Sequence, residues 1–262
     1  MKRWRYVLLV LCTAVISING TYLMNYFMKS EENKQKYEDI SEIGFPETEA
    51  DHEEENDQQD VKQSEDDFDY QSLIAMNSDC VGWIQIPGTD INYPVVQAAD
   101  NEFYLTHNFN RETAACGAIF MDYRNDVDAK AEHLILYGHQ MKDNSMFKQL
   151  NGYKEEIFYK EHPNIKLYLH EQKYEYEITA VYVTDVANGG GYYNYLHWNT
   201  RKEQLNYLQQ KMAGYQICDT GKKVMETDEL LSLSTCEYSS DNGRLIVQAR
   251  RKGEMTDGKQ II

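Results

Sequence analysis

The chain has 262 residues, with 26 lysines and arginines against 43 aspartates and glutamates, and a formal net charge of −17. This length accommodates one medium-sized domain with appended segments. The sequence has no basic stripe, no phosphate-binding loop and no dinucleotide glycine pattern, which argues against nucleic-acid and nucleotide functions.

The amino-terminal segment, residues 1–28, has the pattern of a membrane anchor. Three basic residues within the first five positions precede a mostly apolar run over residues 6–28, and about 20 apolar residues suffice to span a bilayer. Because the positive charge lies before the run, we expect the amino end inside the cell and the rest of the chain outside the membrane. A cleaved signal peptide is the alternative, favoured by the dense apolar core over residues 7–18, although no Ala-x-Ala site follows it.

Residues 29–69 are predicted to be an acidic extracytoplasmic linker. They contain 17 aspartates and glutamates against four lysines, so they repel one another and bury too little apolar surface to fold alone. The first part has Tyr37, Ile40 and Ile43 at helical spacing, which favours a short helix where these residues pack on the domain. Binding of cations or basic partners is the alternative role of such a run.

Residues 70–262 form the third predicted segment, a folded domain with about eight short strands and few helices between them. Extended patterns occur at 81–86, 91–97, 117–122, 132–137, 164–169, 173–184, 231–236 and from 244 onward. Helical patterns occur at 69–77, 100–105, 146–150 and 154–159. This balance favours a mainly β architecture that closes as a small barrel.

A long excursion precedes the strand at 231–236. Three glycines at 189–191 open a tyrosine-rich loop, and residues 200–212 follow as a predicted amphipathic helix with Leu205 and Leu208 on one face. The excursion is too long for a hairpin, and long ordered loops on a rigid scaffold tend to carry specificity.

The most informative stretch is the hairpin that begins at residue 231. Its first strand alternates apolar and hydroxyl side chains and ends on Cys236, a polar turn covers residues 239–243, and Arg244 begins the returning strand. Thiol and guanidinium therefore lie near one end of two adjacent strands. A neighbouring cation favours the nucleophilic thiolate form of a cysteine and can also stabilise an oxyanion.

The candidate for proton transfer is His139, which follows the apolar strand at 134–137 and a turn-forming Gly138. Histidine exchanges protons near neutral pH. Alone, Cys236 would more often be a small buried hydrophobe, His139 a structural residue and Arg244 a solvated strand end. In combination they indicate an active site.

This ordered set resembles the active site of the sortases, and Arg244 follows the cysteine by eight residues, as the family pattern requires. The Ser-Thr-Cys triplet that ends at Cys236, the Tyr-Gly-His triplet that ends at His139 and the long excursion are most similar to class B. The resemblance covers roughly residues 70–251. It implies a closed eight-stranded β-barrel with a few peripheral helices and a helix-containing loop before the seventh strand.

The resemblance also implies a cysteine transpeptidase of the cell surface. In this reaction Cys236 attacks the carbonyl after Thr in the C-terminal sorting signal of a surface protein, and an amine of a cell-wall precursor resolves the thioacyl enzyme. His139 then transfers the protons, and Arg244 stabilises the oxyanion or positions the substrate backbone. The implied substrate-binding residues are Ser234, Glu237, Thr184, Asn101 and Leu105. One departure is Gln140, where many relatives carry Asn, which puts the local loop geometry in question.

The five cysteines show no metal-binding spacing, and we predict neither a metal nor another cofactor. Cys12 lies in the predicted membrane segment, and a nucleophilic Cys236 must stay free. Any disulfide would therefore involve Cys80, Cys116 or Cys218.

Two other functions fit the same residues. In a membrane-tethered binding module, the tyrosine-rich loop would recognise a surface ligand while Cys236 and His139 merely pack. In a cysteine peptidase that only hydrolyses, the same groups would act without transfer, so kinetics must separate it from a transpeptidase.

Overall fold

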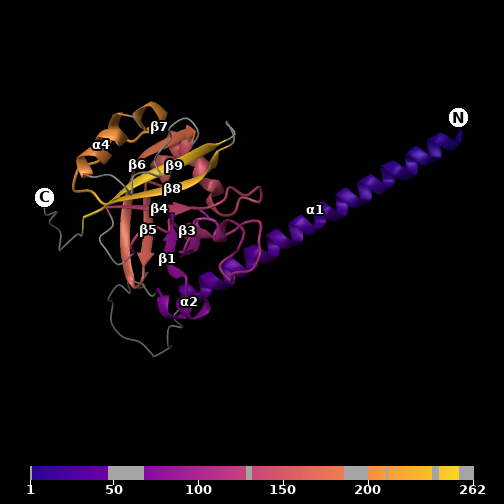
Figure 1. Cartoon of the computed structure of the whole chain (residues 1–262), viewed down its shortest axis with the longest axis horizontal. Coiled ribbons are helices and arrows are strands. Elements are labelled where there is room, and N and C mark those ends of the chain that lie inside the picture. The colour runs from indigo at the N-terminus through magenta and orange to yellow at the C-terminus, as the bar shows by residue number, and fades with distance from the viewer. Residues whose placement is uncertain are drawn as a thin grey trace, which may run out of the picture. The chain divides into compact units, whose positions relative to one another are not determined.

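The computed structural model describes residues 2–46, 68–127, 132–185, 200–210, 212–237 and 242–253. Contacts between backbone atoms divide the chain into two compact units, Met1–Asp39 and Ile40–Ile262. Helix α1, Lys2–Gly44, is drawn in indigo in Figure 1 and supplies the first unit and the first residues of the second.

In the first unit, apolar side chains of α1 such as Val15, Ile16 and Ile18 are exposed. The Asn19 amide donates to the Val15 carbonyl at 2.7 Å, so this polar side chain is satisfied within its own helix. Across the described residues, we find no helix whose length and apolar content together would allow it to cross a membrane.

The second unit is built on a nine-stranded sheet with the spatial order β5-β1-β2-β3-β4-β8-β9-β6-β7. In chain order the strands are β1 (Cys80–Gln85), β2 (Asn92–Val96), β3 (Ile119–Met121), β4 (His133–Tyr137), β5 (Asn164–Leu169), β6 (Gln172–Asp185), β7 (Gln216–Asp219), β8 (Leu230–Glu237) and β9 (Gly243–Arg251). An additional pairing of β5 with β6 closes the first eight strands of that order into a barrel. The predicted fold class is confirmed.

The length of β6 explains both the closure and the ninth strand. Its first residues pair with β5, and its later residues pair with β9 on one side and with β7 on the other. The sequence did not predict β7, which has only four residues, with Ile217 exposed and Cys218 buried. Such a short strand with an exposed isoleucine has no recognisable alternation, and its pairing with β6 specifies it instead.

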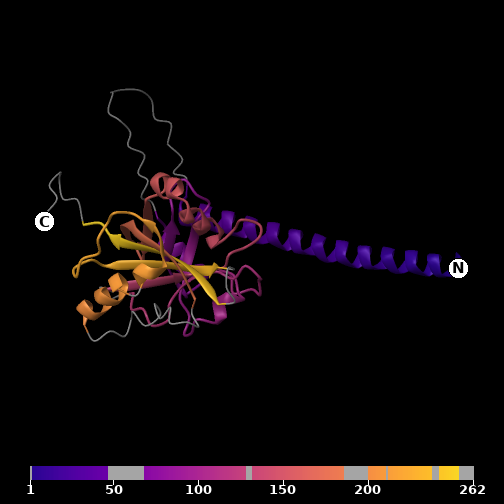
Figure 2. The ribbon, with the colours of Figure 1, turned by 90° about the horizontal axis from the view of Figure 1, so that it is seen from above.

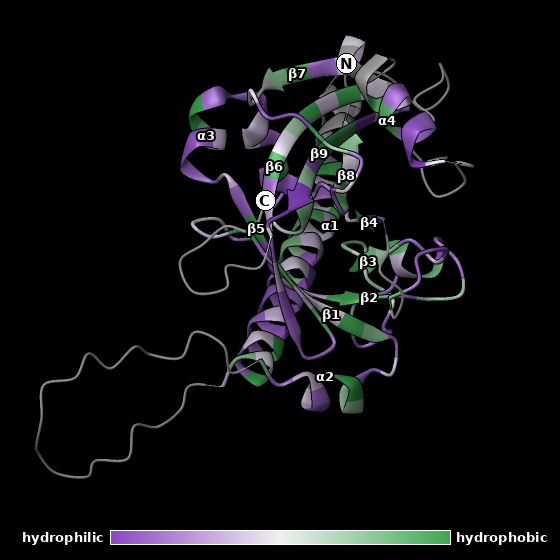
Figure 3. Ribbon diagram, turned by 90° about the vertical axis from the view of Figure 1, so that its left-hand side faces the viewer, coloured by the Kyte–Doolittle hydropathy of each residue, from purple (hydrophilic) through white to green (hydrophobic). Residues whose placement is uncertain are grey.

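Two of the pairings are parallel, β2 with β3 and β4 with β8. The second places a strand from the middle of the domain beside one near its carboxyl end, as Figure 1 and Figure 2 show. Figure 3 shows green, hydrophobic stretches in both β1 and β2, and Ile84 and Val95 on these strands are fully buried. The core therefore lies inside the closed sheet.

Short helices join the strands. They are α2 (Tyr70–Met76), η1 (Phe103–Leu105), η2 (Phe147–Lys154), α3 (Glu156–Glu161), α4 (Arg201–Gln210) and η4 (Met212–Tyr215). At the start of α2 the Asp69 carboxylate accepts the Ser72 N–H at 2.9 Å, which satisfies a backbone donor that the helix itself leaves unpaired.

Part of the predicted linker belongs to the barrel unit. Ile40 is buried, and the Phe45 ring lies 5.5 Å from the Trp83 ring and 5.3 Å from the Tyr168 ring. The Gly44 carbonyl accepts the Asp69 N–H at 2.9 Å. Residues 40–46 thus pack against one end of the barrel, whereas residues 47–67 lie outside the described residues.

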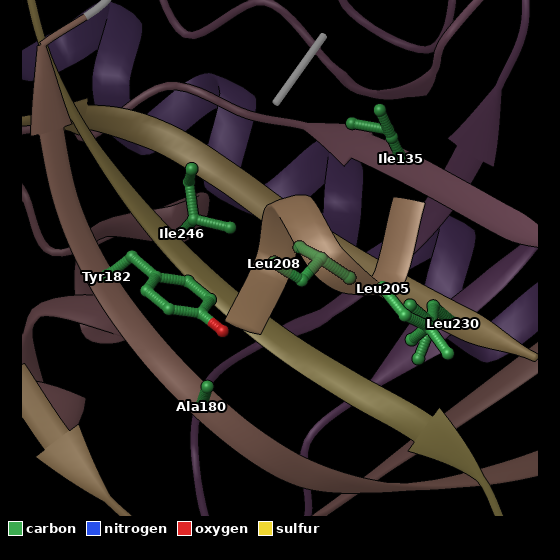
Figure 4. Close-up of a cluster of buried hydrophobic side chains, with 7 residues drawn as sticks. All are labelled: Ile135, Ala180, Tyr182, Leu205, Leu208, Leu230 and Ile246. Atoms are coloured by element: carbon green, nitrogen blue, oxygen red, sulfur yellow. The ribbon is translucent and has the colours of Figure 1, made fainter. Parts of the chain in front are cut away.

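Helix α4 covers one face of the sheet, and the expected helix in the excursion is confirmed. Leu205 and Leu208 are both buried, as their shared face predicted. The cluster that they complete, here called the α4 cluster, consists of Ile135, Ala180, Tyr182, Leu205, Leu208, Leu230 and Ile246 (Figure 4). The glycines and tyrosines of the excursion, at 189–195, lie outside the described residues.

Candidate active site

The parallel pairing of β4 with β8 brings the predicted histidine and cysteine segments together. Its last paired residues are Tyr137 and Ser234, and the Gly138 N–H then donates to the Ser234 carbonyl at 3.2 Å. Two residues further along each segment are His139, after β4, and Cys236, on β8. The two predicted catalytic residues therefore lie at the same end of adjacent strands.

The antiparallel pairings continue the same row across the sheet. Cys236 lies opposite Arg244 on β9, and Arg244 lies opposite Thr184 on β6. Directly opposite residues point to the same face of a sheet, so Cys236, Arg244 and Thr184 form one row, here called the site row. Cys236 and Arg244 are both partly exposed.

Ser234 lies on the same face as Cys236, one strand repeat further into the barrel sheet, and is buried. Next to it on β9 is Ile246, a member of the α4 cluster. The face is therefore covered by α4 beyond Ser234 and becomes partly exposed at Cys236 and Arg244.

The imidazole of His139 is held by a single backbone group. Its Nε2 lies 2.7 Å from the carbonyl oxygen of Leu105. Because a carbonyl only accepts hydrogen bonds, Nε2 carries the proton in the neutral ring, and Nδ1 is the nitrogen with a lone pair. Nδ1 is bonded to no residue that the structure describes, so its lone pair is available to accept a proton.

Two glycines make room for this arrangement. A Cβ added to Gly138 would lie 2.4 Å from Ile119 Cδ1, so the glycine before the histidine is needed for close packing. Gly117 has a φ of +58°, and a Cβ there would lie 2.4 Å from the Tyr104 carbonyl oxygen and 3.1 Å from His139 Cδ2. The sequence analysis did not single out Gly117, because only the fold brings it behind the imidazole.

Arg244 is oriented by its neighbour in the chain. Its Nη1 donates to the Gly243 carbonyl at 2.9 Å. A guanidinium has five N–H donors in a planar fork, and this bond uses one of them to orient the group.

Thr184, at the far end of the site row, has an unusual environment. Its side chain is buried, and its hydroxyl has no hydrogen-bond partner among the described residues. A buried hydroxyl without a partner costs about 1–3 kcal/mol, which is the kind of cost that a ligand removes when it binds.

Asn101 is bonded within the protein on both sides of its amide. Its Nδ2 donates to Asp122 at 3.1 Å, and its Oδ1 accepts the Tyr123 N–H at 3.0 Å. The Asp122 carboxylate also accepts the Tyr137 hydroxyl at 2.8 Å and the Arg124 guanidinium at 2.6 Å. Burial alone would raise the pKa of Asp122, but the bonds from Arg124 and Tyr137 outweigh it and lower that pKa. This network, which sequence reasoning missed, connects Asn101 to the strand before His139.

Leu105 and Glu237 complete the predicted set. The Leu105 side chain is 40% exposed beside the carbonyl that holds His139, so it is not the core residue that its hydrophobicity would also allow. Glu237 lies opposite Gly243 in the ladder, and its side chain is outside the described part of the structure, as are residues 238–241 of the turn.

Gln140 and Lys148 form a further contact to the backbone of Cys236. Gln140 Nε2 donates to the Cys236 carbonyl at 2.8 Å, and Lys148 Nζ donates to Gln140 Oε1 at 3.2 Å. From the sequence, Gln140 is only a departure from the family pattern. Nothing local in the sequence shows that Lys148 reaches Gln140.

All five cysteines are free thiols. Cys80, Cys116 and Cys218 are buried, and burial raises the pKa of Cys80 to about 11. Among the described residues, we find no group of three or more histidine, cysteine, aspartate or glutamate side chains placed to hold a metal ion.

Comparison with known proteins agrees with this geometry. The Sortase domain family model matches residues 84–252. Sortase B of Listeria monocytogenes is 37% identical over 180 residues, which cover 68% of this chain and 72% of that protein. Sortase B of Staphylococcus aureus is 30% identical over 254 residues, which cover 95% of this chain and 97% of that protein.

Solved structures show the same relationship. The crystal structure of sortase B from B. anthracis in complex with AAEK1 has a TM-score of 0.70 and 32% identity, covering 87% of this chain and all of that one. The Staphylococcus aureus sortase B–substrate complex has a TM-score of 0.70 and 30% identity, covering 86% of this chain and 98% of that one. The chain belongs to the sortase family, and within it to class B, the sortase B cysteine transpeptidases.

Proposed function

We propose that this enzyme cleaves the C-terminal sorting signal of a surface protein after its Thr residue and transfers the protein to an amine of a cell-wall precursor. The observation that carries the proposal is the site row, in which Cys236 and Arg244 lie opposite each other while the His139 segment runs beside Cys236. These are the nucleophile, the cation and the proton carrier that acyl transfer requires.

In the first step the Cys236 thiolate attacks the carbonyl carbon, and a carbon–sulfur bond forms as the carbon–nitrogen bond breaks. His139 gives a proton to the leaving amine, so that the products are a thioacyl enzyme and the released end of the signal. In the second step His139 takes a proton from the incoming amine, a new amide bond forms, and the thiolate leaves. The hydrogen bond of Nε2 to Leu105 supports Nδ1 as the atom that carries these protons.

Arg244 stabilises the negative charge that develops on the attacked carbonyl oxygen. Its position opposite Cys236 and its fixed bond to the Gly243 carbonyl support this role.

We further propose that Ser234, Thr184, Glu237, Leu105 and Asn101 line the binding groove for the sorting signal. The unpartnered hydroxyl of Thr184 and the exposed side chain of Leu105 support direct contacts for these two. Asn101 keeps one N–H of its amide after the bond to Asp122, and this N–H is the donor for a substrate carbonyl.

The sorting signal and the wall precursor place the reaction on the outer side of the cell membrane. We propose that residues 1–28 anchor the enzyme there, with the amino end inside, because the apolar run over residues 6–28 follows a basic end and exposes side chains such as Val15 and Ile16 on α1. The full chain should then stay in the membrane fraction at alkaline pH. Release of a shorter soluble product would instead identify a cleaved signal peptide.

The test is incubation of the purified enzyme with a panel of sorting peptides and candidate amines, followed by mass spectrometry. Wild type should give an amide-linked product and a trapped peptide–enzyme adduct, and Cys236→Ala should give neither while remaining folded. Hydrolysed peptide alone, at every amine concentration, would favour a peptidase. Peptide binding without cleavage would favour a binding module.

A further inference from the structure

We propose that Gln140 is a positioning residue that holds the catalytic cysteine against the histidine segment, and that Lys148 sets the orientation in which it does so. This inference rests on the proposed function, since it concerns how Cys236 and His139 are kept in register. It assigns a task to the residue at which this chain departs from the family pattern.

The backbone ladder between β4 and β8 stops before it reaches His139 and Cys236. The parallel pairing of β4 with β8 ends at Tyr137 and Ser234, and the last backbone bond runs from Gly138 to Ser234. Cys236 lies two residues beyond Ser234 and is the penultimate residue of β8. The β9 side of Cys236 is still paired, with Arg244, but no ladder bond from β4 reaches Cys236. A contact from the His139 side therefore decides how Cys236 is held against that segment.

Gln140 supplies a contact to Cys236 from the segment that carries His139. Its Nε2 donates to the Cys236 carbonyl at 2.8 Å, and Gln140 is the residue directly after His139. A single side chain therefore links the backbone of the nucleophile to the backbone of the proton carrier, beyond the reach of the ladder.

The loop that carries Gln140, residues 139–147, is held by hydrogen bonds of its own. The Phe147 N–H donates to the His139 carbonyl at 2.9 Å, and Gln140 pairs with Met146 in an isolated bridge. The Met146 N–H donates to the Tyr93 hydroxyl at 3.0 Å inside the barrel. The loop is thus closed on itself and tied to β2, so Gln140 starts from a rigid base.

Lys148 sets the orientation of the Gln140 side-chain amide. An ammonium group only donates hydrogen bonds, so Lys148 Nζ, at 3.2 Å, must face the oxygen of the Gln140 amide. The nitrogen is then turned to Cys236, whose carbonyl can only accept. Lys148 therefore selects the one orientation of the amide in which it bonds to Cys236 instead of repelling it.

A carboxylate in place of the Gln140 amide should break the link to Cys236. In Gln140→Glu the carboxylate keeps its attraction to Lys148 but has no N–H, so it loses the bond to Cys236 and repels its carbonyl oxygen. A displacement of about 1 Å of a catalytic group can cost roughly 100-fold in rate. We expect kcat to fall by roughly 10- to 100-fold with little change in KM, because substrate contacts remain.

The chain offers a matched control in Gln149, on the same helix as Lys148. Gln149 Nε2 donates to the Asp90 carboxylate at 2.5 Å, and its Oε1 accepts the Asp90 N–H at 2.9 Å, so it also bridges two loops. Gln149→Glu makes the same change in side chain and charge but touches neither catalytic segment. Repulsion from the Asp90 carboxylate should lower its melting temperature. Its kcat per folded molecule should stay within a factor of about two of wild type, because Gln149 contacts Asp90 and not Cys236.

Lys148→Met is the second test and does not change Gln140 itself. It removes the cation that orients the amide, so we expect a smaller fall in kcat, roughly two- to fivefold, and Lys148→Arg should retain the wild-type value. In the double variant Gln140→Glu/Lys148→Met the losses should not add, because both act through one bond.

The experiment measures kcat, KM and melting temperature of the full-length variants beside Cys236→Ala, with a cleavable sorting peptide. A selective fall in kcat for Gln140→Glu, with Gln149→Glu unaffected, supports the inference. The inference is overturned if Gln140→Glu has wild-type kcat, or if Gln140→Glu and Gln149→Glu lose kcat equally. The proposed function still stands in both cases as long as Cys236→Ala is inactive. If Gln140→Glu fails to fold, Lys148→Met decides, and an unchanged kcat there would overturn the inference. Turnover by Cys236→Ala would instead remove the proposed function.

Discussion

One face of the sheet formed by β4, β8, β9 and β6 carries two similar rows of residues. The site row ends in Cys236, Arg244 and Thr184, with the His139 segment beside it. At the other end of the same strands, a second row pairs a histidine and an arginine across an apolar position. This covered row consists of His133, Leu230, Arg250 and Glu177.

In the covered row the polar side chains of His133, Arg250 and Glu177 all have partners within the protein. His133 is buried, with Nε2 2.8 Å from the Ser232 hydroxyl and Nδ1 3.2 Å from the Gln204 amide nitrogen. Burial, with a smaller effect of the nearby Arg201 charge, lowers the pKa of His133 to about 3, so this ring is neutral. Arg250 pairs with Glu177 at 2.6 Å.

The site row differs in what is left unsatisfied. His139 has one backbone bond, Thr184 has a buried hydroxyl without a partner among the described residues, and a thiol replaces the leucine between histidine and arginine. A histidine and an arginine on neighbouring strands therefore do not by themselves make a reactive centre. Groups that the fold positions but does not satisfy are what distinguish the site row.

The largest expected difference between the rows concerns their histidines. His139→Ala should lower kcat/KM by roughly 10²- to 10⁴-fold, the contribution of a general acid–base residue, with an unchanged melting temperature. His133→Ala should do the opposite, because it leaves two buried polar groups unpaired at about 1–3 kcal/mol each and should not change turnover per folded molecule. Peptide-cleavage kinetics beside thermal melts measure both. The comparison fails if His133→Ala loses turnover while it remains fully folded.

The arginines provide the second comparison. Arg244→Ala should lose about 2.7–4 kcal/mol of transition-state stabilisation, as on removal of an oxyanion donor, and Arg244→Lys should restore only part of it because Lys lacks the planar fork. Arg250→Ala, on the same strand and face, should leave catalysis unchanged and reduce stability by about 1 kcal/mol. Equal activity of the two alanine variants would remove Arg244 from the site.

Truncation tests whether the site row depends on the distant end of the barrel. Deletion of residues 1–39 should leave Phe45 packed on Trp83 and Tyr168, whereas deletion of residues 1–67 removes it. Loss of a buried phenylalanine costs about 3–5 kcal/mol, and Phe45 is only half-buried, so we expect about 3 kcal/mol between the two truncations.

Urea unfolding measures this difference, and kcat of the folded fraction should be the same for both truncations. Equal stability would show that residues 40–46 add nothing to the barrel. Equal stability combined with lower activity in the shorter protein would instead connect these residues to the site.

The covered row should also produce a pH dependence of stability. The folded His133 takes up a proton near pH 3, whereas the unfolded chain does so at its ordinary value of 6.5. Between these values the unfolded state binds more protons than the folded state. The contribution of neutral His133 to the free energy of unfolding is therefore fully present above pH 6.5. It is lost as the pH falls, by at most about 1.4 kcal/mol per pH unit.

Urea unfolding at a series of pH values should therefore show a steeper acid loss for wild type than for His133→Asn, which has no such group. Parallel curves would mean that His133 is protonated equally in both states. Carboxylates contribute to both curves alike, so only the difference between them is assigned to His133.

The smallest expected effect is that of the unpartnered hydroxyl. Thr184→Val keeps the shape but removes the hydroxyl, so stability should stay the same or rise slightly. If the sorting signal bonds to this hydroxyl, KM should rise roughly fivefold, equivalent to about 1 kcal/mol. An unchanged KM would remove Thr184 from the binding groove.

The site row was predictable because its information is local. Alternation up to Cys236, a polar turn and Arg244 define a hairpin whose two strands must lie side by side, and an apolar strand before His139 marks a strand end. Residues that matter through distant contacts had no such signal. Gly117 has no room for a side chain because the Tyr104 carbonyl and the His139 ring lie against it. Lys148 reaches Gln140 because the loop between them closes through the bridge of Gln140 with Met146. The four-residue β7 is likewise specified by the neighbouring strand.

The distribution of the free thiols allows Cys236 to be titrated with a thiol-specific label in the folded protein. In the barrel unit Cys80, Cys116 and Cys218 are each at most 5% exposed, whereas Cys236 is partly exposed. A charged, thiol-specific label added to folded protein that lacks residues 1–39, and with them Cys12, should therefore attach once per competent molecule. Dividing the label bound by the total protein gives the fraction of functional enzyme in a preparation, without any engineered probe, and a second label per molecule reports that the barrel has opened.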